Sequence, residues 1–148
     1  MVQAIPTYIM SCFKIPDSLC DHIESMISKF WRGSKQGERK MHWIAWNNLC
    51  KDKKAGGMGF RTLREFNLAM LAKQGRRILQ NSETLLSTCL KGRYFPRNSF
   101  LQASLGFNPS YTWRSILQAR QEVIDHVGVW RVGNGHDIHI WNDKWLPY

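Results

Sequence analysis

Helical spacing of apolar residues, interrupted by proline and glycine, is the feature that most constrains the fold of this chain. After Pro16, apolar residues recur mostly three or four positions apart until Gly33, and this is the spacing of one face of an α-helix. Asp17 or Ser18 is the expected N-cap, because short polar side chains accept hydrogen bonds from the first free backbone N–H groups. The apolar face of this predicted helix consists of Leu19, Ile23, Met26, Ile27 and Phe30.

Two further helices are predicted between Thr62 and Pro96. Thr62 and Glu65 have the spacing of a capping box and are expected to open the first of them. Asn81-Ser82 is expected to end that helix and cap the next, which must stop before Pro96 because proline lacks the backbone donor that a helix interior requires. Phe66, Ala69, Met70, Lys73 and Arg77 fall on neighbouring turns of the first helix, and Leu85, Leu86, Cys89 and Leu90 form a short apolar face on the second.

A fourth helix is expected to start at Ser110 or Thr112 and to end by Gly128. Trp113 lies in its apolar stripe, and we interpret this tryptophan as a core residue because burial of an aromatic ring is a large stabilising term in a small domain. The stripe comprises Trp113, Ile116, Leu117, Val123 and Ile124.

The hydrophobic pattern of the C-terminal residues is no longer helical. Asn134-Gly135 stands among β-prone residues between Trp130 and Trp141, a strong sequence signal for a hairpin. We therefore predict a mainly α fold with a small C-terminal helix plus β-hairpin, divided into residues 2–97 and 98–148. The boundary is soft, because apolar residues such as Phe100 and Phe107 could pack back onto the first part.

The positive charge is regional. The chain has 148 residues, 43% of them hydrophobic, and a net charge of +10. Residues 29–64 carry a net +8 and residues 73–97 a net +5, whereas residues 98–148 are neutral. Such concentration favours a polyanionic partner, although a solvated basic surface with no dedicated partner is the alternative. No run of about 20 uncharged apolar residues is present, so no membrane span is expected.

Metal, cofactor and small-molecule sites are not predicted. Cys12, Cys20, Cys50 and Cys89 form no close CxxC pair, which argues against a zinc site and against a disulfide framework. His136 and His139 lack nearby cysteines and are three apart in a predicted strand, where such positions point to opposite faces.

The acidic residues do not predict catalysis. Polymerisation on a template needs clustered carboxylates that hold two metal ions, and no Tyr-x-Asp-Asp sequence is present. Asp17, Asp21 and Glu24 share one helix face and are interpreted as solvated acids near the positive end of the helix dipole. We expect no enzymatic activity from this chain.

Residues 39–60 combine cations, aromatic rings and turn glycines. Trp43 and Trp46 offer flat apolar faces beside lysines that attract phosphate, a pairing typical of proteins that track a nucleic-acid strand. Either tryptophan could instead serve core packing, and both readings stay open at this point.

The order of these residues resembles the plant LINE-type (non-LTR) retrotransposon reverse transcriptases, whose parent activity is RNA-directed DNA polymerisation. The resemblance rests on Arg39–Phe60, Ile5–Phe13 and Tyr111–Ile116 and falls after the polymerase palm, on the thumb and connecting region. It implies a thumb-like helical region that holds RNA or DNA by the backbone, without reading sequence. The expected contacts are Lys35, Arg39, Lys40, Lys51, Lys53, Lys54, Arg61, Lys73 and Arg77, with possible base stacking by Trp43 and Trp46.

The resemblance also implies a fragment. The zinc module and ribonuclease H domain that follow in related polyproteins are absent, and Met1 falls where the middle of a longer protein would be. Arg32 and Arg76 stand where family members usually carry tryptophan, a difference that either C-to-U editing of a plant mitochondrial transcript or a DNA mutation explains. We predict a mitochondrial, organelle-encoded protein, with a nuclear one as the alternative.

Three functional hypotheses follow. The chain is a non-catalytic remnant that still binds the nucleic-acid backbone, a relic with no biochemical role, or an accessory subunit of a polymerase supplied in trans. The third requires an exposed apolar face, and Val2–Phe13 and the hairpin are the expected places for it. The sequence does not specify the oligomeric state.

Overall fold

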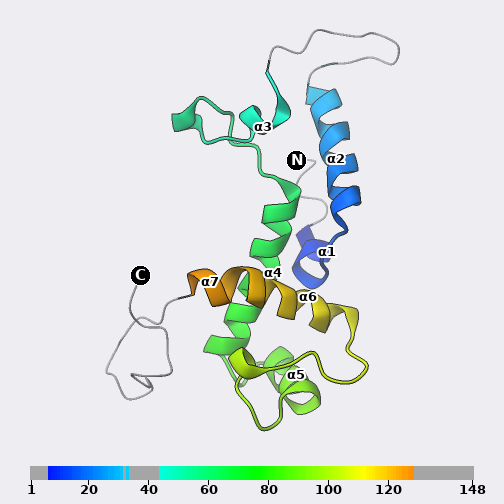
Figure 1. Ribbon diagram of the computed structural model, residues 1–148, viewed down its shortest axis with the longest axis vertical. Coiled ribbons are helices and arrows are strands. Elements are labelled where there is room, and N and C mark those ends of the chain that lie inside the picture. Colours follow the sequence, from blue (N-terminus) through cyan, green and yellow to red (C-terminus); the bar gives the residue numbers. More distant parts are fainter. Residues whose placement is uncertain (1–6, 32, 34–43, 129–148) are drawn as a thin grey trace. The chain divides into compact units, whose positions relative to one another are not determined.

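A computed structural model describes residues 7–31, 33 and 44–128 of the chain (Figure 1). These residues form helices joined by loops. The α-helices are α1 (Thr7–Cys12), α2 (Asp17–Trp31), α3 (Trp46–Leu49), α4 (Leu63–Gln80), α5 (Leu85–Tyr94), α6 (Tyr111–Ala119) and α7 (Asp125–Val127). Two short 3-10 helices, η2 (Lys53–Ala55) and η3 (Phe100–Gln102), and one π-helical turn, η4 (Arg120–Ile124), complete them.

The predicted fold class was wrong in one respect. The described part of the chain contains helices and no strand, so a mainly α fold with a β-hairpin is corrected to a helical fold there. The segment that carries the hairpin signal, Trp130–Trp141, lies outside the described residues, as do His136 and His139.

The chain forms two compact units, Met1–Leu71 and Ala72–Tyr148. Helix α4 begins in the first unit and ends in the second. This division lies elsewhere than the one at residues 97 and 98, which was predicted from the change in sequence pattern and stays a prediction. Each unit has its own apolar core.

In the first unit, the buried face of α2 is rotated from the predicted one. Cys20 and Ile27 are buried in a cluster with Met10, Ile15 and Leu63. The predicted face was wrong for three of its members, because Leu19 is 47%, Met26 51% and Phe30 79% exposed. The helix begins at Asp17, so the cap position is Pro16, whose carbonyl accepts from the N–H groups of Leu19 and Cys20.

Asn67 joins three segments of the first unit. Its side chain is buried, its Nδ2 donates to the carbonyls of Met10 and Phe13 at 2.8 and 2.9 Å, and its Oδ1 accepts from the Ile15 N–H at 2.8 Å. The three partners are backbone groups at the end of α1 and in the link to α2. One amide thereby fixes the path of that link against α4.

The buried side of α4 also differs from the predicted one. Leu63, Asn67 and Leu71 are buried in the first unit, and Gly75 and Ile78 continue the same face in the second. A Cβ at position 75 would lie 2.8 Å from Ile124 Cδ1, so any larger residue there would displace the end of the Ile124 side chain. Of the residues predicted to share a face, Phe66 and Met70 are half-buried, and Ala69, Lys73 and Arg77 are exposed.

Arg76 is exposed on α4, so an arginine at this position carries no burial penalty. The exposed position accommodates either arginine or tryptophan without disturbing the core. Arg32 lies outside the described residues.

Trp113 is the centre of the second core, as predicted. It is fully buried and stacks on Tyr94 with ring centroids 4.7 Å apart and on Phe95 with centroids 5.6 Å apart. Phe100 meets its edge, with centroids 6.1 Å apart. The other residues of this cluster are Ile78, Ala103, Ile116 and Leu117.

Arg120 is buried at the start of η4. Its Nη1 donates to the carbonyls of Phe100 and Ala103 at 2.7 and 2.8 Å, and its Nε lies 3.5 Å from Asp125 Oδ2. The guanidinium thus supplies a donor to the Ala103 carbonyl and a second donor to the Phe100 carbonyl, which also accepts from the Ala103 N–H. It holds the 100–103 turn beside the π-helical turn.

Some of the helix ends lie where the sequence predicted them. Ser110 caps α6, because its Oγ accepts from the Trp113 N–H at 3.3 Å, and α5 ends before Pro96 as predicted. Thr84, instead of Asn81-Ser82, caps α5. On α5, Leu86 and Leu90 pack against the second core, whereas Leu85 and Cys89 were wrongly assigned to its apolar face and are exposed.

The four cysteines are free thiols, and Cys20 is buried as a small hydrophobic residue. None of the helices in the described ranges is long and apolar enough to cross a bilayer.

Replacing Asn67 with alanine is expected to destabilise the first unit by about 2–4 kcal/mol, because three buried backbone groups lose their partner. Urea denaturation followed by circular dichroism measures this change. Asn48→Ala, which removes an exposed amide, is the control and should change stability by less than about 0.5 kcal/mol. Equal effects of the two substitutions would contradict the assigned role of Asn67.

Candidate nucleic-acid interface

The loop Lys51–Gly59, called here the basic loop, is held by its own backbone hydrogen bonds. The Asp52 carbonyl accepts from the N–H groups of Ala55 and Gly57 at 2.9 and 3.0 Å. The Lys51 carbonyl accepts from Gly59 N–H at 3.0 Å, which ties the end of the loop to its start. These bonds fix the backbone from which the lysines project.

Glycine is required at Gly57 for steric reasons. A Cβ at Gly57 would overlap the carbonyl oxygen of Lys51. Gly56 and Gly59 have φ values of +80° and +71°, a region that L-residues with side chains rarely adopt. The glycines of the sequence Ala55–Phe60 therefore build the tight return of this loop.

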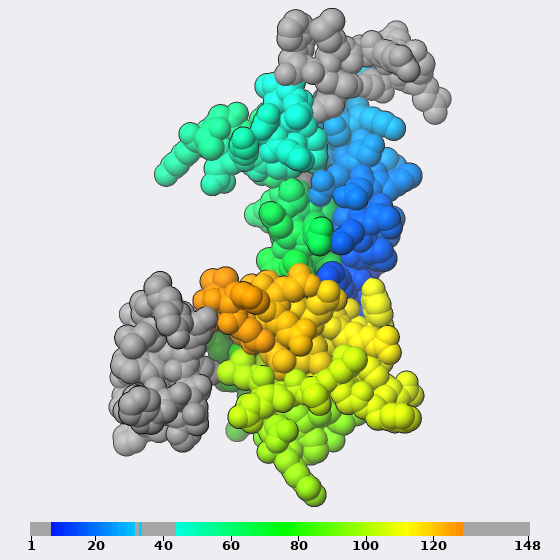
Figure 2. Space-filling model, viewed as in Figure 1, coloured from blue at the N-terminus to red at the C-terminus, as the bar shows by residue number. Residues whose placement is uncertain are grey.

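Lys51, Lys53 and Lys54 are exposed on the basic loop. Lys53 and Lys54 belong to the short helix η2, and Figure 2 shows this segment, coloured cyan to green, standing out from the helices of the first unit. Projecting ammonium groups on a fixed backbone are suited to contact a polyanion from outside.

Trp46 has a packing role. Its ring lies against Phe60, with centroids 5.0 Å apart, and Phe60 also meets the edge of Trp31 at 5.1 Å. The indole Nε1 of Trp46 donates to Glu24 Oε2 at 3.3 Å. The contacts of Trp46 therefore agree with the packing role considered for it, and base stacking by Trp46 stays a prediction.

Glu24 is a structural acceptor instead of a solvated acid. Its Oε1 accepts from the Leu63 N–H at 2.6 Å, so a side chain of α2 satisfies a free donor at the N-terminus of α4. Among the other acids of α2, Asp17 forms a salt bridge, with its Oδ2 3.4 Å from Nη2 of Arg64. The interpretation of these acids as merely solvated was wrong for Glu24.

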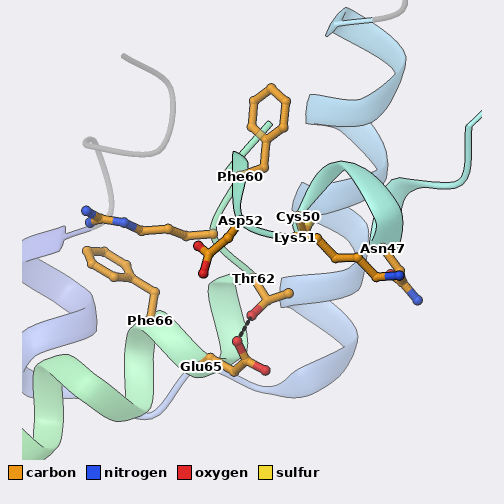
Figure 3. Close-up of a pocket in the computed structure, with 10 residues that line it drawn as sticks. Asn47, Cys50, Lys51, Asp52, Phe60, Thr62, Glu65 and Phe66 are labelled. Carbon is orange, nitrogen blue, oxygen red and sulfur yellow. Dashed lines mark hydrogen bonds between the residues drawn. The ribbon is translucent and has the colours of Figure 1, made fainter. Parts of the chain in front are cut away.

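Thr62 and Glu65, which were predicted to form a capping box, are bonded through their side chains at the same helix end. Thr62 Oγ1 donates to Glu65 Oε2 at 2.6 Å, and α4 begins directly after Thr62 (Figure 3). Arg61, the residue before this pair, places its guanidinium 5.1 Å from the centre of the Phe66 ring.

A pocket of about 550 Å³ opens between the basic loop and the start of α4. In Figure 3, the Asp52 carboxylate is seen between the Phe66 ring on one side and Thr62 on the other, and Glu65 is bonded to Thr62. Two carboxylates, a hydroxyl and an aromatic ring thus face one space. The lining residues are Asn47, Cys50, Lys51, Asp52, Gly59, Phe60, Arg61, Thr62, Glu65 and Phe66.

The thiol of Cys50 lines this pocket in its protonated form. Burial, and after it the negative charges of Glu24 and Glu65, raises the pKa of Cys50 above the ordinary thiol value. A protonated thiol is a poor nucleophile, which argues against a catalytic cysteine here.

The structure brings together only some of the predicted contacts. Lys51 and Arg61 line the same pocket, and Lys53 and Lys54 follow Lys51 on the basic loop. Lys73 and Arg77 belong to the second unit and are exposed on α4. Lys35, Arg39, Lys40 and Trp43 lie outside the described residues.

No group of three or more histidine, cysteine, aspartate or glutamate residues that could hold a metal ion occurs in the described ranges.

Sequence reasoning missed Asp52, Glu65 and Phe66 as lining residues of one pocket. Glu65 was identified only as a capping residue and Phe66 only as part of an apolar stripe. The available signal was the proximity of Asp52 to three lysines, since an acid inside a basic run lowers phosphate affinity and so suggests another role.

Comparison with known proteins shows a relative that covers nearly the whole chain. An uncharacterized mitochondrial protein of Arabidopsis thaliana is 44% identical over 145 residues, which are 97% of this chain and 94% of that protein. The chain belongs to the family of this plant mitochondrial protein. The predicted mitochondrial origin is confirmed by this relationship.

A second, longer relative is also a plant protein. A protein of Arabidopsis thaliana that carries the provisional name ribonuclease H protein is 31% identical over 149 residues, covering 99% of this chain. This chain spans only 24% of the length of that relative. No protein-family profile matches the chain, and no solved structure does.

Replacing Gly57 with alanine is expected to destabilise the first unit by about 1–3 kcal/mol, because the new methyl group overlaps the Lys51 carbonyl. Thermal unfolding followed by circular dichroism measures the effect. Gly92→Ala is the matched control, since a Cβ there meets nothing within 4 Å and the residue lies inside α5. That variant should gain up to about 1 kcal/mol from helix propensity, and equal behaviour of both variants would refute the assigned loop geometry.

Proposed function

We propose that this chain is a non-catalytic, retroelement-derived protein that binds the phosphate backbone of RNA or DNA through its basic loop. The observation that carries the proposal is the set of three exposed lysines on a loop whose backbone is fixed by internal hydrogen bonds. Such cations release condensed counterions from a nucleic acid and bind without reading its sequence.

The relatives support the retroelement part of the proposal. The longer one is named as a ribonuclease H protein, and this chain aligns with about a quarter of it. The resemblance of Arg39–Phe60 to LINE-type reverse transcriptases assigns the matched part to the thumb and connecting region. In this role the chain holds a duplex while another part of the parent protein performs the chemistry.

Absence of enzymatic activity is part of the proposal. The acids of the described residues serve structure in two cases, Glu24 at the N-terminus of α4 and Asp125 beside Arg120. In the pocket, burial and, after it, the carboxylates of Glu24 and Glu65 raise the pKa of the Cys50 thiol, which disfavours the nucleophilic thiolate.

The triple variant Lys51→Ala, Lys53→Ala, Lys54→Ala is expected to weaken binding of duplex DNA and to reduce its salt dependence. Each lost phosphate contact lowers the log-log slope against salt by about 0.9, so the slope should fall by up to about 2.7. Fluorescence anisotropy at several salt concentrations measures both quantities.

A second triple variant controls for net charge. Lys29→Ala, Lys91→Ala, Arg97→Ala removes three exposed cations that lie outside the basic loop. An equal loss of DNA affinity in the two triple variants would indicate a general charge effect and contradict a dedicated site. No measurable binding by the unmodified chain at low salt would refute the proposed function and favour a relic without a biochemical role.

A second candidate function, that of an accessory subunit for a polymerase supplied in trans, is favoured by α1. Tyr8 and Ile9 on this helix are 80% and 54% exposed, so apolar surface is available where the accessory hypothesis requires it. Residues 2–6 of the expected segment lie outside the described residues.

Co-expression with the polymerase part of a LINE-type reverse transcriptase tests this second function. The chain is expected to copurify, and Ile9→Lys should abolish copurification because it places a charge in the contact. Ile44→Lys, which charges another half-exposed isoleucine away from α1, is the control and should leave copurification unchanged. If both variants copurify as well as the unmodified chain does, α1 is not the docking surface.

A further inference from the structure

The pocket beside the basic loop has a lining that phosphate binding does not use. Its volume of about 550 Å³ is within the range of small-ligand sites, roughly 300–1,000 Å³. Asp52 and Glu65 repel phosphate, so their position between cations calls for a different ligand group. The pocket requires a group that is flat, partly apolar and rich in hydrogen-bond donors.

We propose that this pocket binds an unpaired nucleobase carrying an amino group, guanine above all, while the lysines of the basic loop hold the adjoining phosphates. The proposal rests on the proposed function, since the loop must first bring the strand to the pocket.

The aromatic side of the pocket supports a base. Phe66 is half-buried, and the Arg61 guanidinium lies over its ring, 5.1 Å from the ring centre, so a planar cation backed by an aromatic ring stands at this side of the pocket. Aromatic and guanidinium planes both stack on bases, with little dependence on which base it is. This side supplies affinity for the ring system.

The carboxylates supply discrimination. Ionised carboxylates are acceptors only, and each has two oxygens. Guanine offers adjacent N1–H and N2–H donors, which match both oxygens of one carboxylate, and adenine and cytosine each offer an exocyclic amino group. Uracil and thymine present two carbonyl oxygens flanking their single N–H, and these oxygens are repelled by Asp52 and Glu65.

Asp52 is the residue to test. Only its backbone carbonyl takes part in the hydrogen bonds of the basic loop, so Asp52→Asn changes the pocket and leaves those bonds in place. Glu65 is less suitable, because it is bonded to Thr62 at the start of α4. Glu83→Gln removes an exposed carboxylate in the second unit and is the matched control.

The experiment measures binding of labelled 12-nucleotide oligothymidylate strands by fluorescence anisotropy. One central position carries guanine, adenine, cytosine, thymine or an abasic site. The guanine strand is expected to bind at least about fivefold more tightly than the all-thymine strand, the lower end of the discrimination of a good bidentate pair. Asp52→Asn should remove this preference and leave the affinity for the all-thymine strand unchanged or higher. Glu83→Gln should preserve the preference.

Cysteine alkylation locates the base. The guanine strand should slow the reaction of Cys50, which lines the pocket, with iodoacetamide, and the exposed Cys89 should react at an unchanged rate. Peptide mass spectrometry at pH 8.5 measures both rates.

The outcomes separate the two proposals. No binding of any strand refutes the proposed function, and the pocket proposal fails with it. Binding of all strands with equal affinity refutes the pocket proposal alone. A guanine preference that persists in Asp52→Asn, or that leaves Cys50 unprotected, also refutes it, because the preference would then arise elsewhere.

Discussion

The first unit depends on one buried amide. Asn67 lies on a helix face whose other members are apolar, and its three hydrogen bonds all go to backbone groups between Met10 and Ile15. Without it, α1 and the link to α2 would have no fixed register on α4, because apolar contacts alone have no direction. With this register fixed, Glu24 of α2 reaches the Leu63 N–H and Trp46, and those two contacts position the start of α4 and the base of the basic loop. The start of α4 and the basic loop both line the pocket, so its geometry depends on this register.

The second unit uses a comparable solution with a charged group. Arg120 donates to two carbonyls of the 100–103 turn, and the aromatic stack around Trp113 packs beside it. In both units a long-range polar side chain satisfies backbone atoms of an irregular segment, and the apolar residues close around it. Buried polar groups are costly when they lack partners, so the bonds of Asn67 and of the Arg120 Nη1 favour one arrangement of each segment.

Local patterns predicted the helices better than the faces they bury. The end of α5, the start of α6, the Thr62–Glu65 pair and the burial of Trp113 followed from spacing and capping rules. The buried side of α2 did not follow from these rules, because apolar residues on adjacent stripes of a helix cannot be told apart until the partner helix is known. Long-range hydrogen bonds of the polar residues Glu24 and Asn67 fix how α1, α2 and α4 pack. The pocket was unpredictable for the same reason. Asp52 and Phe66 are 14 positions apart and meet only through the return of the basic loop.

The fixed backbone of the basic loop has a consequence for the cost of association. A disordered lysine tail must lose backbone and side-chain freedom together when it meets a polyanion, at roughly 1–2 kcal/mol per residue for the backbone. In the Lys51–Gly59 segment that backbone entropy is already lost on folding, through the Asp52 and Lys51 carbonyl bonds. Only the lysine side chains remain to be ordered, so a small number of cations can hold a strand that a flexible segment of equal charge would hold more weakly.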